Sequence, residues 1–385
     1  MTRILHISAD YPDAVRPLKT RAIAALIEGT DELFDHEVYS LNRVGGWVGW
    51  SRPGSLEIVS DERIVRSCRY AAPARGFLLA RAMAGVADGI NADLRRREQK
   101  IDLVHGHKLT VEGLAARRLA GLLGVPFMLT VQGNSDQKLL RARPDLAGRW
   151  RGCWQDAAQI ISFAPWATRW VEGRLGKRVR SAVNLPCVLA SDAVIPPVPA
   201  PPLVRTAFNL VDWKNKNIAT LAAAVAIARC EVPELQLEIA GDGRSDTQAA
   251  VDAILHRAGV TDIARRVGPI APERIQQWMN GAAMFAMPSH RESFGMVFAE
   301  ALLAGCPILY SRGTSVDGYF DGAPFARAVR ANDPRELANR IVEFLRGQSA
   351  IKESLARWQG DRGADSFRRR EILDRYAAIV REISR

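Results

Sequence analysis

The stretch PSHRESFGMVFAEALLAGCPILYSRG, residues 288–313, contains three local patterns around which the rest of the sequence can be arranged. Its first part, residues 288–295, is rich in polar and turn-forming residues. From Met296 onward the apolar residues have the spacing of a helix, which Gly305 ends. The apolar run Ile308–Tyr310 then has the character of a short buried strand. The stretch therefore predicts a loop, a helix and a strand in succession.

The predicted helix has a carboxylate just before its start and a second one within it. Glu292 precedes the helix, and Glu300 follows eight positions later. The first N–H groups of a helix have no intrahelical partner, so a helix start after a loop can bind a phosphate. Carboxylates accept hydrogen bonds from sugar hydroxyls. The pattern therefore indicates a ligand with a diphosphate between two hydroxyl-rich rings. Helix-terminal charge is the alternative explanation for the two carboxylates.

The same residues resemble a known family. The pattern PS-x-x-E-x-FG-x-x-x-x-EA-x-x-x-G-x-P resembles the E-x7-E signature of the retaining glycosyltransferases of family 4, glycosyl transferases group 1. The resemblance implies the α/β fold called GT-B, with two Rossmann-like doubly wound domains that face each other across a cleft.

Strand and helix patterns alternate along the whole chain and predict two α/β domains with parallel sheets. In the first part we expect strands over 3–8, 37–41, 56–59, 64–68, 101–105 and 126–134, with helices over 20–28, 76–97 and 111–123. In the second part we expect strands over 204–210, 235–240, 266–267, 284–286 and 308–310. Helices are expected there over 218–229, 247–258, 272–280, 297–304 and 334–345, with a last one over 366–383.

The proline-rich run PPVPAPP, residues 196–202, predicts an extended linker that acts as a hinge. We predict an N-terminal acceptor-binding domain over 1–190 and a nucleotide-sugar-binding domain over 203–365. By resemblance, a final helix over 366–385 crosses back to the first domain.

Composition is that of a soluble globular protein, with 48% hydrophobic and 25% charged residues. No apolar run has the length of a membrane span, and the N-terminus lacks a signal pattern, so we expect a cytoplasmic protein. Five scattered cysteines without C-x-x-C spacing argue against a disulfide framework or a zinc site.

The net charge of +11 lies mainly in the first half. Residues 1–195 hold 28 Lys and Arg against 20 Asp and Glu. A basic surface of this kind suits an anionic membrane, an acidic acceptor or nucleic acid, although a solvated arginine-rich surface explains it as well. Trp150 and Trp154, which lie among four arginines, suggest peripheral contact with the inner face of the cell membrane. Nucleic acid is not expected as a partner.

The segment FNLVDWKNKN, residues 208–217, resembles the family's phosphate-binding pattern G-R-L-x-x-x-K-N. Lys214 matches the lysine, and Asn209 stands where the arginine is expected. A cation aimed at the leaving diphosphate stabilises the transition state. Lys216, Arg205, Lys19 and Arg16 are candidates for replacing the missing arginine.

The resemblance also assigns nucleotide-sugar contacts in the second domain. Gly241 lies in the turn over the nucleotide, Ile270 contacts the base through its backbone, and Glu300 accepts hydrogen bonds from the ribose. Glu292 faces the donor sugar, and with Lys214 it forms the predicted catalytic pair. The backbone N–H groups of four consecutive residues bind sugar and diphosphate: Phe294, Gly295, Met296 and Val297.

Acceptor or sugar contacts are expected at the ends of strands in the first domain, where ligands of parallel sheets bind. Candidates are Lys19, His107 and Gln132, the last in place of a family histidine. The loop that contains Lys19 lacks the family's glycine pair. His105 and His107 form an H-x-H pattern, but with no third ligand near them in the sequence we expect no metal site.

The resemblance implies a retaining, metal-independent transferase of the hexosyl type without a cofactor. It moves a sugar from a UDP- or GDP-sugar to an acceptor hydroxyl of a polysaccharide or glycolipid. One alternative is a catalytically impaired sugar-nucleotide-binding protein on the same fold. Another is a different GT-B enzyme, such as a sugar-nucleotide epimerase. The sequence identifies neither the sugar, the acceptor nor the oligomeric state.

Overall fold

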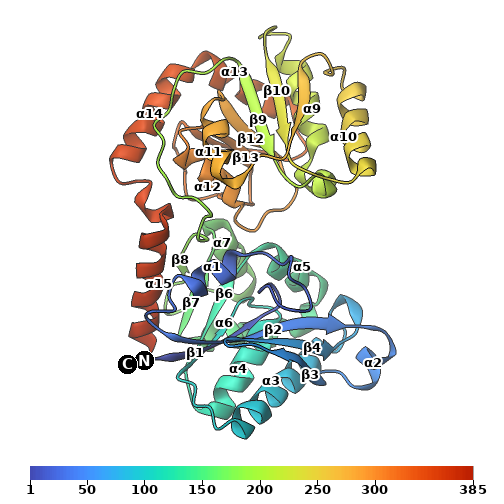
Figure 1. The fold of residues 1–385 in the computed structure, drawn as a ribbon, viewed down its shortest axis with the longest axis vertical. Helices are drawn as coiled ribbons and strands as arrows, with labels where there is room; N and C mark the ends of the chain where they lie inside the picture. The colour runs from blue at the N-terminus through green and yellow to red at the C-terminus, as the bar shows by residue number, and fades with distance from the viewer. Residues whose placement is uncertain (385) are drawn as a thin grey trace. The chain divides into compact units, whose positions relative to one another are not determined.

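A computed structural model describes residues 1–384 and divides into two compact units. The first unit comprises Met1–Val188 and the chain from Arg370 onward, and the second comprises Leu189–Arg369. Each unit holds one sheet with helices packed around it (Figure 1). The predicted α/β class is therefore confirmed.

The elements of the first unit follow the predicted alternation and extend it. In chain order they are β1 Arg3–Ser8, α1 Ala22–Glu28, β2 Asp35–Val44, α2 Gly46–Ser51, β3 Leu56–Asp61, β4 Val65–Ala71, the 3-10 helix η1 Ala74–Gly76, α3 Leu79–Arg96, β5 Leu103–Gly106, α4 Glu112–Leu123, β6 Phe127–Val131, α5 Asn134–Ala142, η2 Pro144–Leu146, α6 Ala147–Asp156, β7 Gln159–Ser162, α7 Pro165–Leu175, β8 Val183–Asn184 and α15 Arg369–Ile383.

The first sheet has the strand order β3-β4-β2-β1-β5-β6-β7-β8. All neighbours are parallel except β3, which pairs antiparallel with β4. The prediction of a fully parallel sheet was therefore wrong at this edge. The three residues between β3 and β4 allow only a hairpin, since a parallel connection needs a crossover of a dozen or more residues.

The centre of this sheet is buried on both faces. Ile4, Leu103 and Met128, from three neighbouring strands, are fully buried in one cluster. Helix α15 contributes Ile372 and Tyr376 to that cluster, so the end of the chain completes the core of the first unit.

The elements of the second unit are β9 Leu203–Ala207, η3 Leu210–Asp212, α8 Trp213–Lys216, α9 Ile218–Ala228, β10 Gln236–Ala240, α10 Ser245–Arg257, β11 Ala264–Gly268, α11 Pro272–Asn280, β12 Met284–Met287, α12 Met296–Leu303, β13 Ile308–Ser311, β14 Ala326–Val329, α13 Pro334–Arg346, α14 Gln348–Gly360 and η4 Asp365–Phe367. Its sheet is parallel throughout, with the order β11-β10-β9-β12-β13-β14.

The proline-rich run 196–202 is extended, but it packs within the second unit. The Ile195 N–H donates to the Leu303 carbonyl (2.8 Å), and the Lys352 ammonium donates to the Val198 carbonyl (2.6 Å). Gly305 permits this approach, because a Cβ there would lie 2.6 Å from the Pro197 nitrogen. Residues 196–202, which the sequence predicts as a hinge, therefore belong to the second unit. The boundary between the two units lies earlier in the chain, at Leu189.

Several elements have no counterpart among those predicted from the sequence, mainly between residues 134 and 184. One of them, α6, buries Trp150 and Trp154 completely. Their indole N–H groups donate to the carbonyls of Thr110 and Gly176, each at 2.8 Å, which removes the usual cost of burying a polar group. The expectation that these tryptophans contact a membrane was therefore wrong.

The loops after β9 and β10 lie against each other through a glycine. Gly241 has φ +140°, and a Cβ at this position would lie 1.8 Å from the Phe208 carbonyl oxygen. Two hydrogen bonds hold the loops in contact. The Phe208 N–H donates to the Ala240 carbonyl (3.1 Å), and the Leu210 N–H donates to the Asp242 carbonyl (2.8 Å). A side chain at position 241 would force the two loops apart.

We therefore expect Gly241→Ala to lower the free energy of unfolding by on the order of 3 kcal/mol, because strain and a backbone clash combine. Gly360→Ala is the matched control, since a Cβ there meets nothing within 4 Å. Thermal unfolding of both variants checks the prediction. An equal midpoint for the two variants would contradict it.

Candidate functional site

The stretch 288–313 folds as the loop, helix and strand that the sequence predicts. Strand β12 ends at Met287, α12 begins at Met296, and β13 begins at Ile308. Gly295 precedes the helix with φ 70° and ψ 66°, and no side chain caps the helix start. The Phe298 N–H already donates to the Gly295 carbonyl (3.0 Å), so Met296 and Val297 are the first-turn residues whose N–H groups can bind an anion.

Neighbouring segments hold the loop before α12 in place. The Glu292 N–H donates to the Thr314 hydroxyl (2.6 Å), which in turn donates to the Glu292 carbonyl (2.8 Å). On the other side, the Asn217 amide donates to the Pro288 carbonyl (3.1 Å) and the Asn215 amide to the Arg291 carbonyl (3.0 Å). The loop is therefore preorganised by hydrogen bonds.

The cation that meets Glu292 is Lys216. Its ammonium forms an ion pair with the Glu292 carboxylate, and both side chains are largely buried. Lys214, which the sequence pattern selected, is exposed, and its ammonium lies 5.2 Å from the centre of the Trp213 ring. The structure thus brings Lys216, and not Lys214, to Glu292. The signal was present in the sequence, because a Lys-Asn pair occurs at 216–217 as well as at 214–215.

Asn209 and Gly241 both act on backbone conformation at the carboxyl ends of strands. The Asn209 side chain accepts a hydrogen bond from the Val211 N–H (3.0 Å) and caps η3. It supplies no positive charge. Among the proposed replacements, Arg205 is committed elsewhere, because it pairs with Glu238 (2.8 Å) and covers the Trp278 ring.

Glu300 lies on α12, one turn beyond the free helix start. Burial raises the pKa of its carboxyl group, and a hydrogen bond from the Ala190 backbone partly opposes this effect. The side chain is half-buried. Glu300 thus offers a carboxylate at partial exposure, as recognition of a polar ligand requires.

The other predicted nucleotide contacts are divided between core and surface. Phe294 is 2% exposed and stacks on Phe367, so its side chain belongs to the core and only its backbone can face a ligand. Ile270 lines an open hollow of about 590 Å³ together with Arg274 and Trp278. An aromatic base of nucleotide size fits a hollow of this volume.

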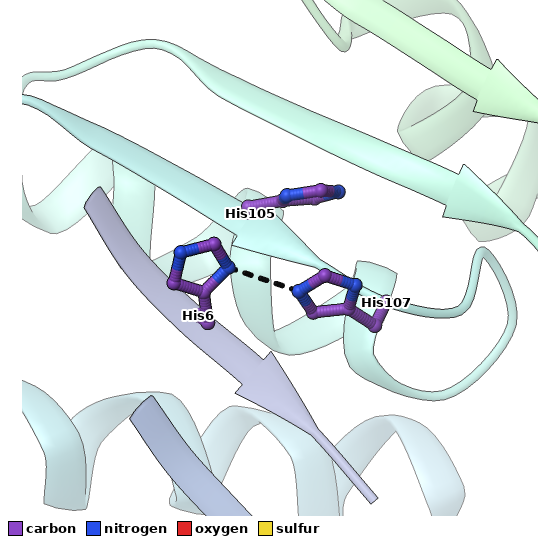
Figure 2. Close-up of side chains that lie close together, drawn as sticks. All are labelled: His6, His105 and His107. Carbon is purple, nitrogen blue, oxygen red and sulfur yellow. Dashed lines mark hydrogen bonds between the residues drawn. The ribbon is translucent and has the colours of Figure 1, made fainter. Parts of the chain in front are cut away.

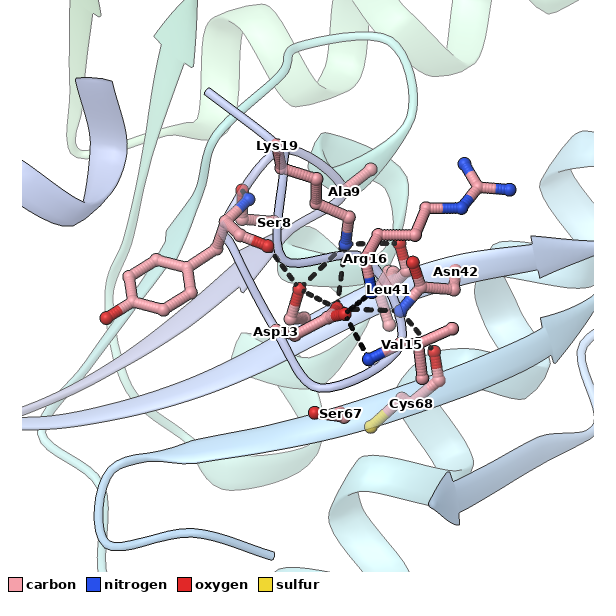
Figure 3. A network of polar contacts seen from close by, with 12 residues as sticks. Ser8, Ala9, Asp13, Val15, Arg16, Lys19, Leu41, Asn42, Ser67 and Cys68 are labelled. Carbon is pink, nitrogen blue, oxygen red and sulfur yellow. Dashed lines mark hydrogen bonds and ion pairs between the residues drawn. The ribbon is translucent and has the colours of Figure 1, made fainter. Parts of the chain in front are cut away.

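In the first unit, the loop after β1 is organised around Asp13 (Figure 3). One carboxylate oxygen accepts from Lys19 (2.8 Å), from the Ser40 hydroxyl (2.5 Å) and from the Asn42 amide (2.7 Å). The other accepts the N–H groups of Val15 and Arg16 (2.9 and 2.7 Å). These bonds lower the pKa of Asp13 against the opposing effect of burial.

The predicted acceptor contact Lys19 is therefore occupied by an internal partner. Its side chain is 9% exposed, and its charge is neutralised by Asp13. The loop contains no glycine, and the hydrogen bonds to Asp13 hold it in place instead. Arg16 is exposed and carries the free charge of this loop.

A buried charged cluster that the sequence did not reveal follows β1 and β5. The Lys108 ammonium lies 2.7 Å from an Asp10 oxygen and 3.8 Å from a Glu112 oxygen. The other Glu112 oxygen has no hydrogen-bond partner among residues 1–384. Burial raises the pKa of Glu112 to about 7. Lys108 and Glu112 are four residues apart in the sequence, and the pairing of β1 with β5 brings Asp10 to them.

Gln132 follows β6 at the same edge of the sheet. Its N–H donates to Asp136 (3.1 Å), a buried carboxylate that also accepts from the N–H and the hydroxyl of Thr110 (3.0 and 2.8 Å). Gln132 is 8% exposed.

His107 differs from the other acceptor candidates, because it has no exposed surface. A ring nitrogen of His6 lies 2.9 Å from its Nε2 atom (Figure 2). His105 is equally buried and contacts Thr130 (2.8 Å) and Tyr376 (3.1 Å). Direct contact of His107 with an acceptor stays a prediction, and its burial argues against it.

A third histidine, distant in the sequence, lies beside His105 and His107 in the fold. His6 pairs with His105 in the register of β1 and β5, so a third histidine does lie beside the H-x-H pair. Ligand atoms of His6, His105 and His107 lie within 4.8 Å of one another, a spacing that could hold a metal ion. The ring nitrogens other than His107 Nδ1 are already in hydrogen bonds with His36, Thr130, Tyr376 or each other. Burial lowers the pKa of all three residues, so the rings are neutral.

Comparison with known proteins finds a family match within the second unit. Residues 204–347 match the family model described as Glycosyl transferases group 1. D-inositol 3-phosphate glycosyltransferase of Streptomyces coelicolor is 30% identical over 132 residues, which are 32% of this chain and 29% of that protein. The similarity thus spans less than a third of the relative's length.

Solved structures extend the likeness to the whole fold. Sucrose-phosphate synthase from Thermosynechococcus elongatus has a TM-score of 0.72 at 18% identity, covering 99% of both chains. Anabaena HepE, determined in complex with UDP and glucose, has a TM-score of 0.64 at 15% identity and covers 99% of this chain and 100% of its own. The predicted GT-B fold is confirmed. Over residues 1–384 no helix combines the length and apolar character of a membrane span.

Glu112 predicts a specific pH dependence of stability. Its folded pKa of about 7 exceeds the ordinary value of 4.5, so the folded state binds the proton more tightly than the unfolded state. The free energy of unfolding should therefore fall as the pH rises from about 4.5 to about 7. The glutamine in Glu112→Gln does not titrate. The free energy of unfolding of this variant, measured relative to that of the wild type, should therefore be higher at pH 8 than at pH 5 by on the order of 2 kcal/mol.

Unfolding midpoints at the two pH values measure this difference, with the exposed Glu57→Gln as the matched control. A wild-type to Glu112→Gln difference that does not change with pH would show that Lys108 holds Glu112 ionised throughout.

Proposed function

We propose, from the membership of residues 204–347 in the glycosyl transferases group 1 family, that this chain is a retaining glycosyltransferase that uses a nucleotide-diphosphate sugar. The observation that carries the proposal is the site around α12. An uncapped helix start, the Lys216–Glu292 pair and the half-buried Glu300 occur together at the carboxyl edge of a parallel sheet. Ligands of such sheets bind at that edge.

The diphosphate is bound by the first turn of α12 and by Lys216. The backbone N–H groups around Gly295, Met296 and Val297 supply donors, and Lys216 supplies the positive charge that the family arginine would give at Asn209. Charge that develops on the leaving diphosphate is stabilised by these fixed groups. The transfer therefore requires neither a divalent metal nor a cofactor.

The two carboxylates recognise hydroxyl groups on either side of the diphosphate. Glu300 accepts from the nucleotide ribose, and Glu292 accepts from the donor sugar while Lys216 orients it. The base lies beside the backbone of Ile270, at the hollow that Arg274 also lines.

No side chain is needed as a nucleophile in this mechanism. The acceptor hydroxyl attacks the anomeric carbon from the face that the diphosphate leaves, so the configuration is kept. The departing phosphate oxygen takes the proton of the acceptor hydroxyl. The bond to the acceptor oxygen forms as the bond to the phosphate oxygen breaks.

The acceptor binds to the first unit, at the residues that follow β1, β5 and β6. Asp10, Lys108 and Gln132 offer polar groups there, and a hydroxyl-rich glycan or glycolipid suits them. An acceptor of this kind places the protein at the cytoplasmic face of a membrane that carries cell-surface polysaccharide or glycolipid.

A sugar-nucleotide-binding protein without transferase activity is the second candidate. It is favoured by one observation, the uncharged Asn209 where a cation is expected. The two candidates differ in turnover but not in donor binding.

Donor binding is tested by thermal stabilisation with UDP, GDP, ADP and CMP in the presence of a chelator. A nucleotide at about 100 times its dissociation constant adds about 2.7 kcal/mol to the free energy of unfolding. We expect one nucleoside diphosphate to stabilise the wild type, and Glu300→Ala to lose most of the shift. If none of the nucleotides shifts the midpoint, both candidate functions are wrong.

Turnover separates the candidates and tests the assignment of the cation. With the stabilising nucleotide as the sugar donor, we expect Lys216→Met to lower kcat by about 100-fold or more, as loss of a transition-state contact does. Lys214→Met is the matched control and should keep most activity, because its side chain lies on Trp213. The opposite ranking of the two variants would restore Lys214 as the phosphate-binding lysine. Donor binding without any product would favour the non-catalytic candidate.

A further inference from the structure

Helix α2 exposes its large side chains and buries its small one. Trp47 is 83% and Trp50 is 53% exposed, and the buried residue of the helix is Gly49. A Cβ at Gly49 would lie 2.7 Å from the Ala72 backbone. Helix α2 therefore packs the face that carries Gly49 against the chain after β4, and its tryptophans face outward. Core packing gives no reason for two tryptophans in this position.

A second exposed apolar segment lies beside α2. Phe77 is 50% exposed, and its ring centroid lies 5.8 Å from that of Trp50. The turn that presents it has an uncommon backbone, with φ 57° at Arg75 and φ 52° at Leu78. Strain of this kind persists where the surrounding structure maintains it, and it often marks functional surfaces. We call the exposed residues Trp47, Val48, Trp50, Phe77 and Leu78 the tryptophan patch.

Arginines accompany the patch without acidic partners. Four exposed arginines lie within four residues of a patch residue in the sequence: Arg43, Arg52, Arg75 and Arg81. Residues 43–54 and 70–81 contain no Asp or Glu. None of the four forms an ion pair within residues 1–384, whereas other exposed arginines such as Arg117 and Arg118 do. The charge of these four arginines is therefore available to an anionic partner, whereas Arg143, which lies 5.6 Å from the centre of the Phe77 ring, pairs with Asp145.

We propose that the tryptophan patch and its four arginines form a docking surface for an anionic lipid bilayer. Tryptophan places its apolar ring and its N–H group at the boundary between headgroups and acyl chains. Arginines attract anionic headgroups, and this attraction adds to the stabilisation gained by burying apolar surface. The exposed rings and the four exposed arginines near them in the sequence are complementary to such a surface.

The tryptophan patch lies on segments that follow the carboxyl ends of two strands of the first unit's sheet. Helix α2 follows the carboxyl end of β2, and the Phe77 turn follows that of β4, which is parallel to β2. Strand β1 is parallel to both β2 and β5, so Asp10 and Lys108 follow strands that end at the same edge. Docking would thus present this edge toward the bilayer. The inference deepens the membrane location proposed above and shares its premise of a lipid-borne acceptor, but its test needs no catalytic activity.

The test is flotation of the full chain with vesicles of phosphatidylcholine alone and of equal parts phosphatidylcholine and phosphatidylglycerol. We expect binding to the anionic vesicles that weakens with salt, and little binding to the neutral ones. The double variants Trp47→Ser/Trp50→Ser and Arg75→Glu/Arg81→Glu should each reduce partitioning at least about tenfold. All four positions are exposed, so circular dichroism should show a native fold.

Matched controls lie on the same unit outside the patch. Val179→Ser removes a fully exposed apolar side chain, and Arg95→Glu reverses an exposed charge, and both should float like the wild type. Equal losses for Arg95→Glu and the arginine pair would mean diffuse charge attraction and would overturn the proposal. So would an unchanged tryptophan variant, absence of binding, or a concentration-dependent dimer that the tryptophan variant abolishes. None of these outcomes affects the nucleotide test of donor binding.

Discussion

The ion pair between Lys216 and Glu292 joins the two loops on which the second unit's site depends. Lys216, in the segment after β9, and Glu292, in the loop after β12, lie 76 residues apart in the sequence, and the side-chain amides of Asn215 and Asn217 donate to backbone carbonyls of the second loop. A buried charge needs a partner, so loss of either residue would leave the other uncompensated. The same contacts position the loop that leads into the helix start at Gly295.

Different interactions hold the loops after the strands in place in the two units. In the second unit, glycine permits close backbone contact, as at Gly241 against Phe208. In the first unit, the loop after β1 has no glycine, and the buried carboxylate of Asp13 gathers five donors instead. As a consequence, the charge of Lys19 is neutralised by Asp13 within the protein. Polar groups that remain accessible come from the ends of neighbouring strands.

Burial also separates the two groups of tryptophans in the first unit. Trp150 and Trp154 have carbonyl acceptors for their N–H groups and lie in the core. Trp47 and Trp50 lie on a helix whose buried face is a glycine, so they are left at the surface. A basic, tryptophan-containing sequence segment thus says little about membrane contact until the packing of each ring is known.

The sequence by itself determined the α/β class, the second unit's alternation and the stretch 288–313, because helix period, glycine stops and apolar strands are local signals. Glu292, Gly295 and Glu300 could be named from that local pattern. The choice between Lys214 and Lys216 could not, because two Lys-Asn pairs compete and only the tertiary structure decides which one reaches Glu292. The cluster at Lys108, the position of His6 beside His105 and the burial of His107 also depend on parallel pairing between strands about 100 residues apart. Contacts of that range leave no periodic trace in the sequence, so only the folded chain decides them.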